Sequence, residues 1–166
     1  MNSKRVALAT LLGTVAFLSS GFLPSPFDKM VIGVQAFCFS LSALLVPRYG
    51  VTFASFVAGA LLSAVRASFF PFSLLFSLFY GLLIDGVFLV VDVSRLESFK
   101  NRLVFLLILA TGIVGVVSMY LTTLMGMLPM IPIMYVALIV LAVPNGALAG
   151  YLTVRIWKKY LVHLVH

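Results

Sequence analysis

The side chains that could do chemistry follow a helical spacing near the middle of the chain. Ser73, Ser77 and Tyr80 are spaced i, i+4 and i+7, which places their hydroxyl groups on one face of a helix. Arg66 precedes them, and three phenylalanines follow it within six residues. A guanidinium group binds a carboxylate or phosphate through paired hydrogen bonds, and aromatic rings stack on flat heterocycles. The segment therefore predicts binding of a planar molecule that can carry an anionic group, rather than a sugar or an inorganic ion.

No set of catalytic side chains stands out in the sequence. There is no glycine-rich loop ending in Gly-Lys-Ser or Gly-Lys-Thr, so we expect this chain not to hydrolyse ATP itself. The two histidines are His163 and His166, too few to hold a catalytic metal. The single cysteine, Cys38, excludes an intrachain disulfide and a cysteine-based metal cluster. We expect neither an enzyme nor a cofactor bound by this chain.

The elements that position these side chains are membrane helices by composition. The chain is 63% hydrophobic and 9% charged, whereas soluble domains have about 25% charged residues. Residues 103–154 are 52 positions without an Asp, Glu, Lys or Arg. This length allows two bilayer crossings of about 20 residues each and a turn. Two prolines within 126–132 would break the helix at that turn. The sequence predicts an integral membrane protein.

Uncharged runs divide the chain into six predicted spans. They cover about 6–23, 30–47, 49–65, 68–91, 103–124 and 133–156. Each is close to the roughly 17–25 residues that a crossing needs. The first apolar run exceeds the usual 7–15 residues of a signal-peptide core, so we expect it to be retained. The predicted fold is all-α, a polytopic membrane bundle of six transmembrane helices that forms one domain over residues 1–166.

The basic residues are distributed unevenly between the predicted loops. If the N-terminus is inside, nine of the eleven Lys and Arg residues lie on the inner side, and only Lys29 and Arg66 lie outside. Cytoplasmic loops of membrane proteins collect Lys and Arg. This rule accounts for the net charge of +7 without a nucleic-acid partner. We expect cytoplasmic N- and C-termini and a multi-pass protein of the plasma membrane, in contact with the lipid bilayer.

The remaining polar side chains add candidates for a binding cavity. An amide buried in hydrocarbon without a partner costs several kcal/mol, so Gln35 and Asn145 must face protein or a wet cavity. Tyr120 belongs to the predicted outer half of its helix. The alternative is that such groups hydrogen-bond between helices, at about 1 kcal/mol each. The candidate substrate-binding residues of an outward-facing cavity are Gln35, Arg66, Ser73, Ser77, Tyr80, Tyr120 and Asn145.

Asp85 is the one acid inside a predicted span. A charge at such depth costs about 2.5–3.5 kcal/mol unless it is paired. We expect a structural salt bridge with Arg155 or Arg48 at the same membrane face, with a role in proton coupling as the alternative.

Three stretches of the chain resemble a known family. They are Lys-Arg-Val-Ala-Leu-Ala-Thr-Leu-Leu-Gly at 4–13, Leu-Val-Pro-Arg-Tyr-Gly-Val at 45–51 and Val-Pro-Asn-Gly-Ala-Leu-Ala-Gly-Tyr at 143–151. With six spans in about 170 residues, the chain resembles the substrate-binding S component of energy-coupling factor (ECF) vitamin transporters. Ala9 and Gly13 match the family's alanine-x-x-x-alanine motif, with Gly in place of the second Ala. The family's metal-binding members open with a His-containing N-terminus, which this chain lacks, so metal cargo is disfavoured.

The resemblance implies capture of a small water-soluble vitamin or vitamin precursor from outside. It also implies partners: a transmembrane scaffold subunit, contacted through Ala9 and Gly13, and two ATPase subunits that use ATP. The sequence leaves the particular vitamin open. The alternative is a membrane scaffold protein similar to the rod-shape-determining MreD family, with no transport substrate. A capture protein needs a polar outer cavity, whereas a scaffold does not.

Overall fold

The computed structural model describes residues 3–23, 27–46, 49–67, 70–90, 100–126 and 131–161, and contains only helices and turns in these ranges. For Lys29, Met30 and Leu161 it describes the backbone alone. Two elements are short, the helix α2 (Phe27–Met30) and the π-helical turn η3 (Trp157–Leu161). Six are long: α1 (Ser3–Gly21), α3 (Ile32–Leu45), α4 (Gly50–Val65), α5 (Phe72–Val90), α6 (Lys100–Leu124) and α7 (Pro132–Ile156).

The six long helices lie within or close to the six predicted spans, which confirms the all-α fold. Proline explains two of the boundaries. Pro71 directly precedes α5, and a residue before proline is held away from helical geometry, so α5 begins later than the predicted 68. Pro132 begins α7, where its missing N–H costs no hydrogen bond.

Within the described residues, three helices are long and apolar enough to cross a membrane: α5, α6 and α7 continued by η3. This finding indicates a membrane protein. The helices α3 and α4 are apolar but shorter, with 14 and 16 residues. At 1.5 Å per residue, α3 is roughly 21 Å long against a hydrocarbon core of roughly 30 Å. Six full crossings stay a prediction.

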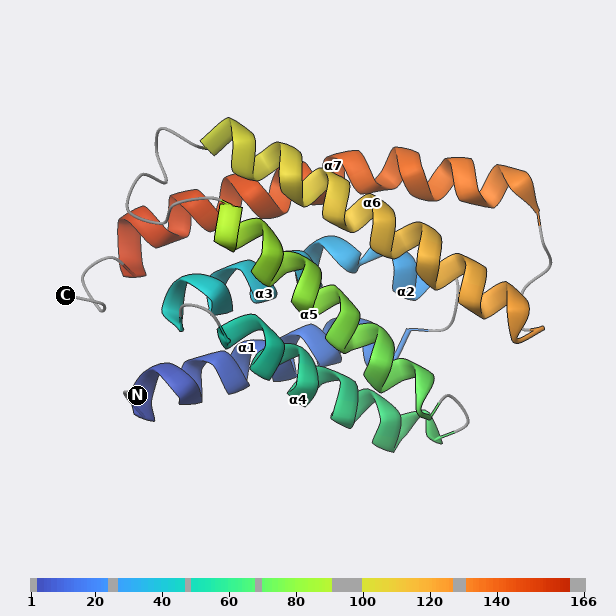
Figure 1. Cartoon of the computed structure of the whole chain (residues 1–166), viewed down its shortest axis with the longest axis horizontal. Coiled ribbons are helices and arrows are strands. Elements are labelled where there is room, and N and C mark those ends of the chain that lie inside the picture. Colours follow the sequence, from blue (N-terminus) through green and yellow to red (C-terminus); the bar gives the residue numbers. More distant parts are fainter. Residues whose placement is uncertain are drawn as a thin grey trace.

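The long helices run along one common axis and alternate in direction (Figure 1). The helices α1, α4 and α6 run away from the end where both termini lie, and α3, α5 and α7 return towards it (Figure 1). The central helix is α3, which contacts all five other long helices and is buried without interruption from Cys38 to Leu45. The pairs α1 with α4, α4 with α5 and α6 with α7 pack against one another.

Small residues allow these pairs to approach closely. A Cβ atom on Gly13 of α1 would overlap the backbone carbonyl of Ala54 on α4. On α7, a Cβ atom on Gly146 would lie 2.5 Å from the Cα of Ile108, and one on Gly150 would lie 3.0 Å from the Cα of Val104. Small residues let helix backbones meet in this way, since no side chain separates them.

Asp85 of α5 supports the first turn of α4. Its Oδ2 accepts hydrogen bonds from the Thr52 backbone N–H at 3.1 Å and from the Thr52 hydroxyl at 2.5 Å. The first N–H groups of a helix lack partners within the helix, and the N-cap Tyr49 supplies no side-chain hydrogen bond. The predicted ion pair with Arg155 is wrong: among the described residues, Asp85 has no such bridge. Arg48, the other predicted partner, lies outside the described residues.

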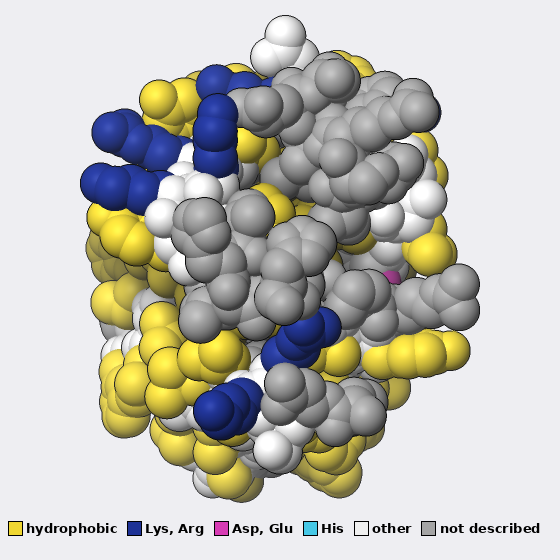
Figure 2. Space-filling view, turned by 90° about the vertical axis from the view of Figure 1, so that its left-hand side faces the viewer, with side chains coloured by type: hydrophobic (Ala, Val, Ile, Leu, Met, Phe, Trp, Pro, Cys, Tyr) yellow, Lys and Arg dark blue, Asp and Glu magenta, His cyan; other side chains and the backbone are white. Residues whose placement is uncertain are grey.

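Basic side chains gather at the end of the bundle where the termini lie. Figure 2 looks onto this end: one group of Lys and Arg lies in the upper part, where α6 and α7 run, and another lies lower down. Arg66 lies at the opposite end, after the last residue of α4. The described cations at the terminal end are Lys4, Arg5, Lys100, Arg102, Arg155, Lys158 and Lys159.

Candidate binding pocket

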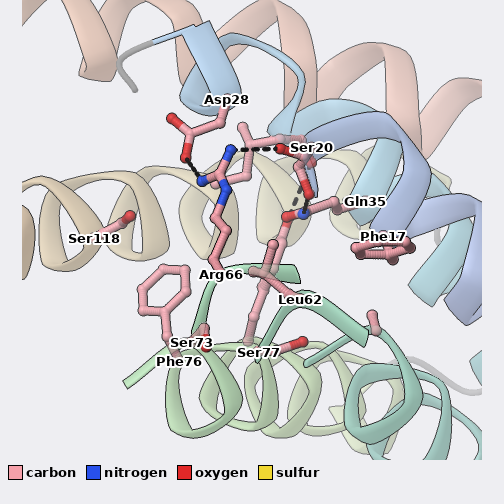
Figure 3. Close-up of a pocket in the computed structure, with 13 residues that line it drawn as sticks. Phe17, Ser20, Asp28, Gln35, Leu62, Arg66, Ser73, Phe76, Ser77 and Ser118 are labelled. Carbon is pink, nitrogen blue, oxygen red and sulfur yellow. Dashed lines mark hydrogen bonds and ion pairs between the residues drawn. The ribbon is translucent and has the colours of Figure 1, made fainter. Parts of the chain in front are cut away.

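A cavity of about 60 Å³ lies at the end of the bundle opposite the termini. Figure 3 shows its lining residues. It forms where the end of α1, the short helix α2 and the start of α3 meet the end of α4, the start of α5 and the second half of α6. The lining residues are Phe17, Ser20, Asp28, Ile32, Gln35, Ala58, Leu62, Arg66, Ser73, Phe76, Ser77, Tyr80 and Ser118.

A second cavity of about 80 Å³ adjoins the first. The two share Arg66, Asp28 and Ser118 among other residues, and the second is bounded further by Leu121 and Met125 near the end of α6. The hollow between α5 and α6 therefore extends from the first cavity towards the end of the bundle.

The structure brings five of the seven predicted binding residues to the first cavity: Gln35, Arg66, Ser73, Ser77 and Tyr80. The spacing of Ser73, Ser77 and Tyr80 indicates the face of α5 that lines the cavity, while their role in binding stays a prediction. Tyr120 and Asn145 do not line either cavity.

Tyr120 lies on the outer side of α6, with 48% of its surface exposed. Ser118 and Thr122, one turn apart, face the cavities from the opposite side of the same helix. Asn145 lies against Gly33, at the contact between α7 and α3. This is the place expected of the alternative interpretation, in which polar side chains join neighbouring helices.

Arg66 is the most highly connected side chain of the pocket (Figure 3). Its Nε donates to the Gly21 carbonyl at 3.2 Å, and its Nη2 donates to the carbonyls of Ser20, at 3.2 Å, and Leu23. Its Nη1 lies 3.4 Å from Asp28 Oδ2 and forms an ion pair with it. The last carbonyl groups of a helix have no partner within the helix, and a cation there is also attracted by the partial negative charge at the C-terminal end of the helix dipole. Arg66 thus caps α1 and holds α2 beside it.

The other polar lining groups are partly engaged with the protein. Gln35 Nε2 donates to Ser20 Oγ at 2.7 Å, and Ser77 Oγ donates to the Ser55 carbonyl at 2.7 Å. Ser73 Oγ lies 2.8 Å from Ser63 Oγ. The Oε1 of Gln35 and the Oγ of Ser118 have no hydrogen-bond partner within the part of the chain that the structure describes. These two atoms are available to a ligand.

The sequence places Ser20 and Ser118 in the same outer half of the predicted bundle but not among the candidate binding residues, and it gave no sign of Asp28 as a lining residue. Asp28 belongs to the short helix α2, which comes before most of the predicted span at 30–47 and is separated from α3 at Val31, and it lines the cavity. The signal that could have found it is the presence of one acid and one arginine, 38 residues apart, at the same predicted membrane face.

Ala9 and Gly13 do not form an exposed surface, contrary to the predicted contact with a partner. Ala9 is 1% exposed, and Gly13 packs on Ala54 of α4. The physical reason is that their small size serves the contact between α1 and α4 within this chain. The face of α1 that is exposed carries larger residues, Leu11 and Leu18 among them, at 61% and 52%.

Among the described residues, no group of three or more His, Cys, Asp or Glu side chains gathers that could hold a metal ion. Comparison of the chain with protein-family models, with curated proteins and with solved structures finds no match. The assignment of a function therefore depends on the sequence pattern and the geometry of the pocket.

Proposed function

We propose that this protein is a substrate-capture subunit of the plasma membrane, similar to the S component of an ECF-type importer. It binds a small water-soluble vitamin or vitamin precursor from outside and delivers it to a transmembrane scaffold with two ATPase subunits. The single observation that carries the proposal is the cavity at one end of the bundle, whose lining includes the polar side chains of Gln35, Ser77 and Ser118.

The distribution of charge supports the orientation. Seven described cations lie at the end that holds the termini, and the cavity lies at the other end. Cytoplasmic ends of membrane proteins are enriched in Lys and Arg, so the terminal end faces the cytoplasm and the cavity faces outward. The six helices cross the membrane in this arrangement, the short α3 included, because bilayers thin locally around short spans.

The pocket favours a ligand without net charge. Its charged lining residues are Arg66 and Asp28, which neutralise each other. A ligand anion would have to take donors from Asp28 or from the carbonyls at the end of α1. A neutral or zwitterionic planar molecule instead uses Gln35 Oε1 and Ser118 Oγ, beside the rings of Phe17 and Phe76. The earlier expectation of a direct Arg66 contact to an anion gives way to a positioning role for Arg66.

Ligand-dependent thermal stabilisation of the purified protein tests the proposal. We expect one member of a panel of water-soluble vitamins and precursors to raise the melting temperature, and Gln35→Ala to abolish that shift. Asn145→Ala is the matched control, because it removes the same amide at a place outside both cavities. A panel without any stabilising member, or equal loss in both variants, would contradict the proposal.

The second candidate, a membrane scaffold of the MreD type, is favoured by one observation. Ala9 is buried and Gly13 packs on Ala54 of α4, so the two residues that match the S-component motif are not exposed to a partner. A scaffold would bind no member of the panel, and its purified complex would contain no ATPase subunit. Purification of the tagged protein from its own membranes distinguishes the two candidates by the subunits that accompany it.

A further inference from the structure

The second cavity offers a ligand mainly apolar contact. The residues that line it without lining the first cavity are Phe72, Leu121, Thr122 and Met125. The one hydroxyl among them, that of Thr122, donates to the carbonyl of Ser118 at 2.7 Å and is therefore engaged within its own helix. The rest of this part of the wall is apolar.

The polar residues that the two cavities share are also engaged, with one exception. Ser73 Oγ lies 2.8 Å from Ser63 Oγ, and Arg66 and Asp28 form an ion pair. Ser118 is 4% exposed, and its hydroxyl has no hydrogen-bond partner among the residues that the structure describes. A buried hydroxyl without a partner costs free energy, so this one marks a position for a polar atom of a ligand.

Two helix faces lead outward from the level of Ser118. On α6, Ser118, Leu121 and Met125 are spaced i, i+3 and i+7, which places them on one face. On α5, Phe72 and Phe76 are spaced i and i+4 and line the same cavity. The start of α5 and the end of α6 lie at the same end of the bundle, so the apolar walls of the second cavity extend towards that end (Figure 1).

The hydrogen-bonding groups lie on the inner side of these walls. Figure 3 shows Arg66 between Gln35, on one side, and Ser118 with Phe76, on the other. Gln35 Oε1 lines the first cavity alone, and within the described ranges it too has no hydrogen-bond partner. The pocket therefore presents free polar atoms at its inner end and at the junction of the two cavities, and apolar surface beyond them.

We propose that the pocket takes an amphipathic ligand in two parts, an uncharged polar head between Gln35 and Ser118 and an apolar chain in the second cavity. The proposal rests on the proposed capture function, since it names the class of ligand for the same pocket. A water molecule needs about 10–15 Å³ of cavity, and a methylene group is of similar size. The second cavity, of about 80 Å³, therefore holds a chain of about five carbons.

Binding of a homologous series of primary alkanamides tests the proposal, because the head stays constant while the chain grows. Acetamide to octanamide are titrated into the purified protein, and saturation-transfer NMR gives each dissociation constant after subtraction of the signal from empty detergent micelles. Each buried methylene should tighten binding by about fourfold up to hexanamide, whose chain fills the cavity. Longer chains should add little, because their last carbons find no further wall.

Three variants separate the two parts of the site. Leu121→Phe fills part of the second cavity, so the gain in affinity should end at a shorter chain while acetamide binding stays unchanged. The matched control is Leu124→Phe, on the same helix but 65% exposed and outside both cavities, and it should keep the full gain. Ser118→Ala should weaken every member of the series by the same factor of about two- to tenfold, the loss of one hydrogen bond. If Leu121→Phe does not fold, Met125→Phe fills the same cavity in its place.

An affinity that does not change with chain length would overturn the two-part site. The same gain in Leu121→Phe and Leu124→Phe would also overturn it, because the chains would then be entering the micelle and not the cavity. The vitamin panel judges the capture function separately. If a vitamin stabilises the protein but chain length has no effect, the two-part site fails and the capture function stands. If the alkanamides show the gain and its loss in Leu121→Phe but no vitamin stabilises the protein, the capture function fails and the two-part site stands.

Discussion

The replacement Arg66→Ala is the sharpest test of how the pocket is held together. It removes four hydrogen bonds, to three carbonyls at the end of α1 and to Asp28, all of them made by a charged donor. Deleting one partner of a buried ion pair costs about 3–5 kcal/mol. Because the Arg66 side chain is 20% exposed, water can reach the freed carbonyls, so we expect the lower limit. The free energy of unfolding should fall by about 3 kcal/mol.

Unfolding of the purified protein by a denaturing detergent, followed by circular dichroism, measures this loss. Arg66→Lys keeps the charge but replaces the planar guanidinium, with its five donors, by a single ammonium. Its free energy of unfolding should lie between those of the wild-type protein and Arg66→Ala. Arg155→Ala is the matched control, an exposed arginine at the other end, and should cost less than about 0.5 kcal/mol. If Arg66→Ala also costs less than about 0.5 kcal/mol, the guanidinium network contributes nothing to stability and the capping argument fails.

Three further predictions follow from other contacts. Gly13→Leu should lower the free energy of unfolding by about 1–3 kcal/mol, because the new side chain meets the Ala54 backbone. Leu11→Ala, on the exposed face of α1, should not lower it. Thermal unfolding compares the two variants, and equal effects would contradict the packing of α1 on α4. Asp85→Ala removes the partner of the Thr52 N–H and should lower the free energy of unfolding by about 1–3 kcal/mol. Asp85→Asn keeps one acceptor oxygen and should lower it less. Equal losses of stability in the two variants would show that the charge matters and the cap does not. A cysteine at Phe22 should react with an impermeant thiol reagent from outside the cell, and one at Lys159 only after permeabilisation; external labelling at Lys159 would reverse the orientation.

The sequence allowed the helices to be located because charge and proline are strong signals in an apolar chain. The uncharged runs gave six helices, and the i, i+4, i+7 spacing gave the face of α5 that lines the cavity. The predicted depth in the membrane does not tell which face of α6 lines the cavity. Tyr120 was therefore predicted as a binding residue, whereas Ser118, two residues earlier, lies in the pocket.

Pairing between distant residues was harder to predict. Asp85 was assigned an ionic partner by its depth, but its hydrogen bonds go to the uncapped first turn of α4. Ala9 and Gly13 show the same limit: their small size predicts a close contact without saying which helix is on the other side. Only the packing of α1 on α4 decides this.

The reach of Arg66 back to α1 has a consequence for how the protein is made. The carbonyls that it caps belong to residues 20–23, and the arginine follows them in the chain by more than 40 residues. During synthesis, the carbonyls at the end of α1 stay without this cap until the chain has been made as far as Arg66, at the end of α4. The start of α4 waits in the same way for Asp85, which lies on the next helix, α5. The end of α1 and the start of α4 thus each depend on a residue that is made later, and a chain that ends before residue 66 lacks the cap of α1.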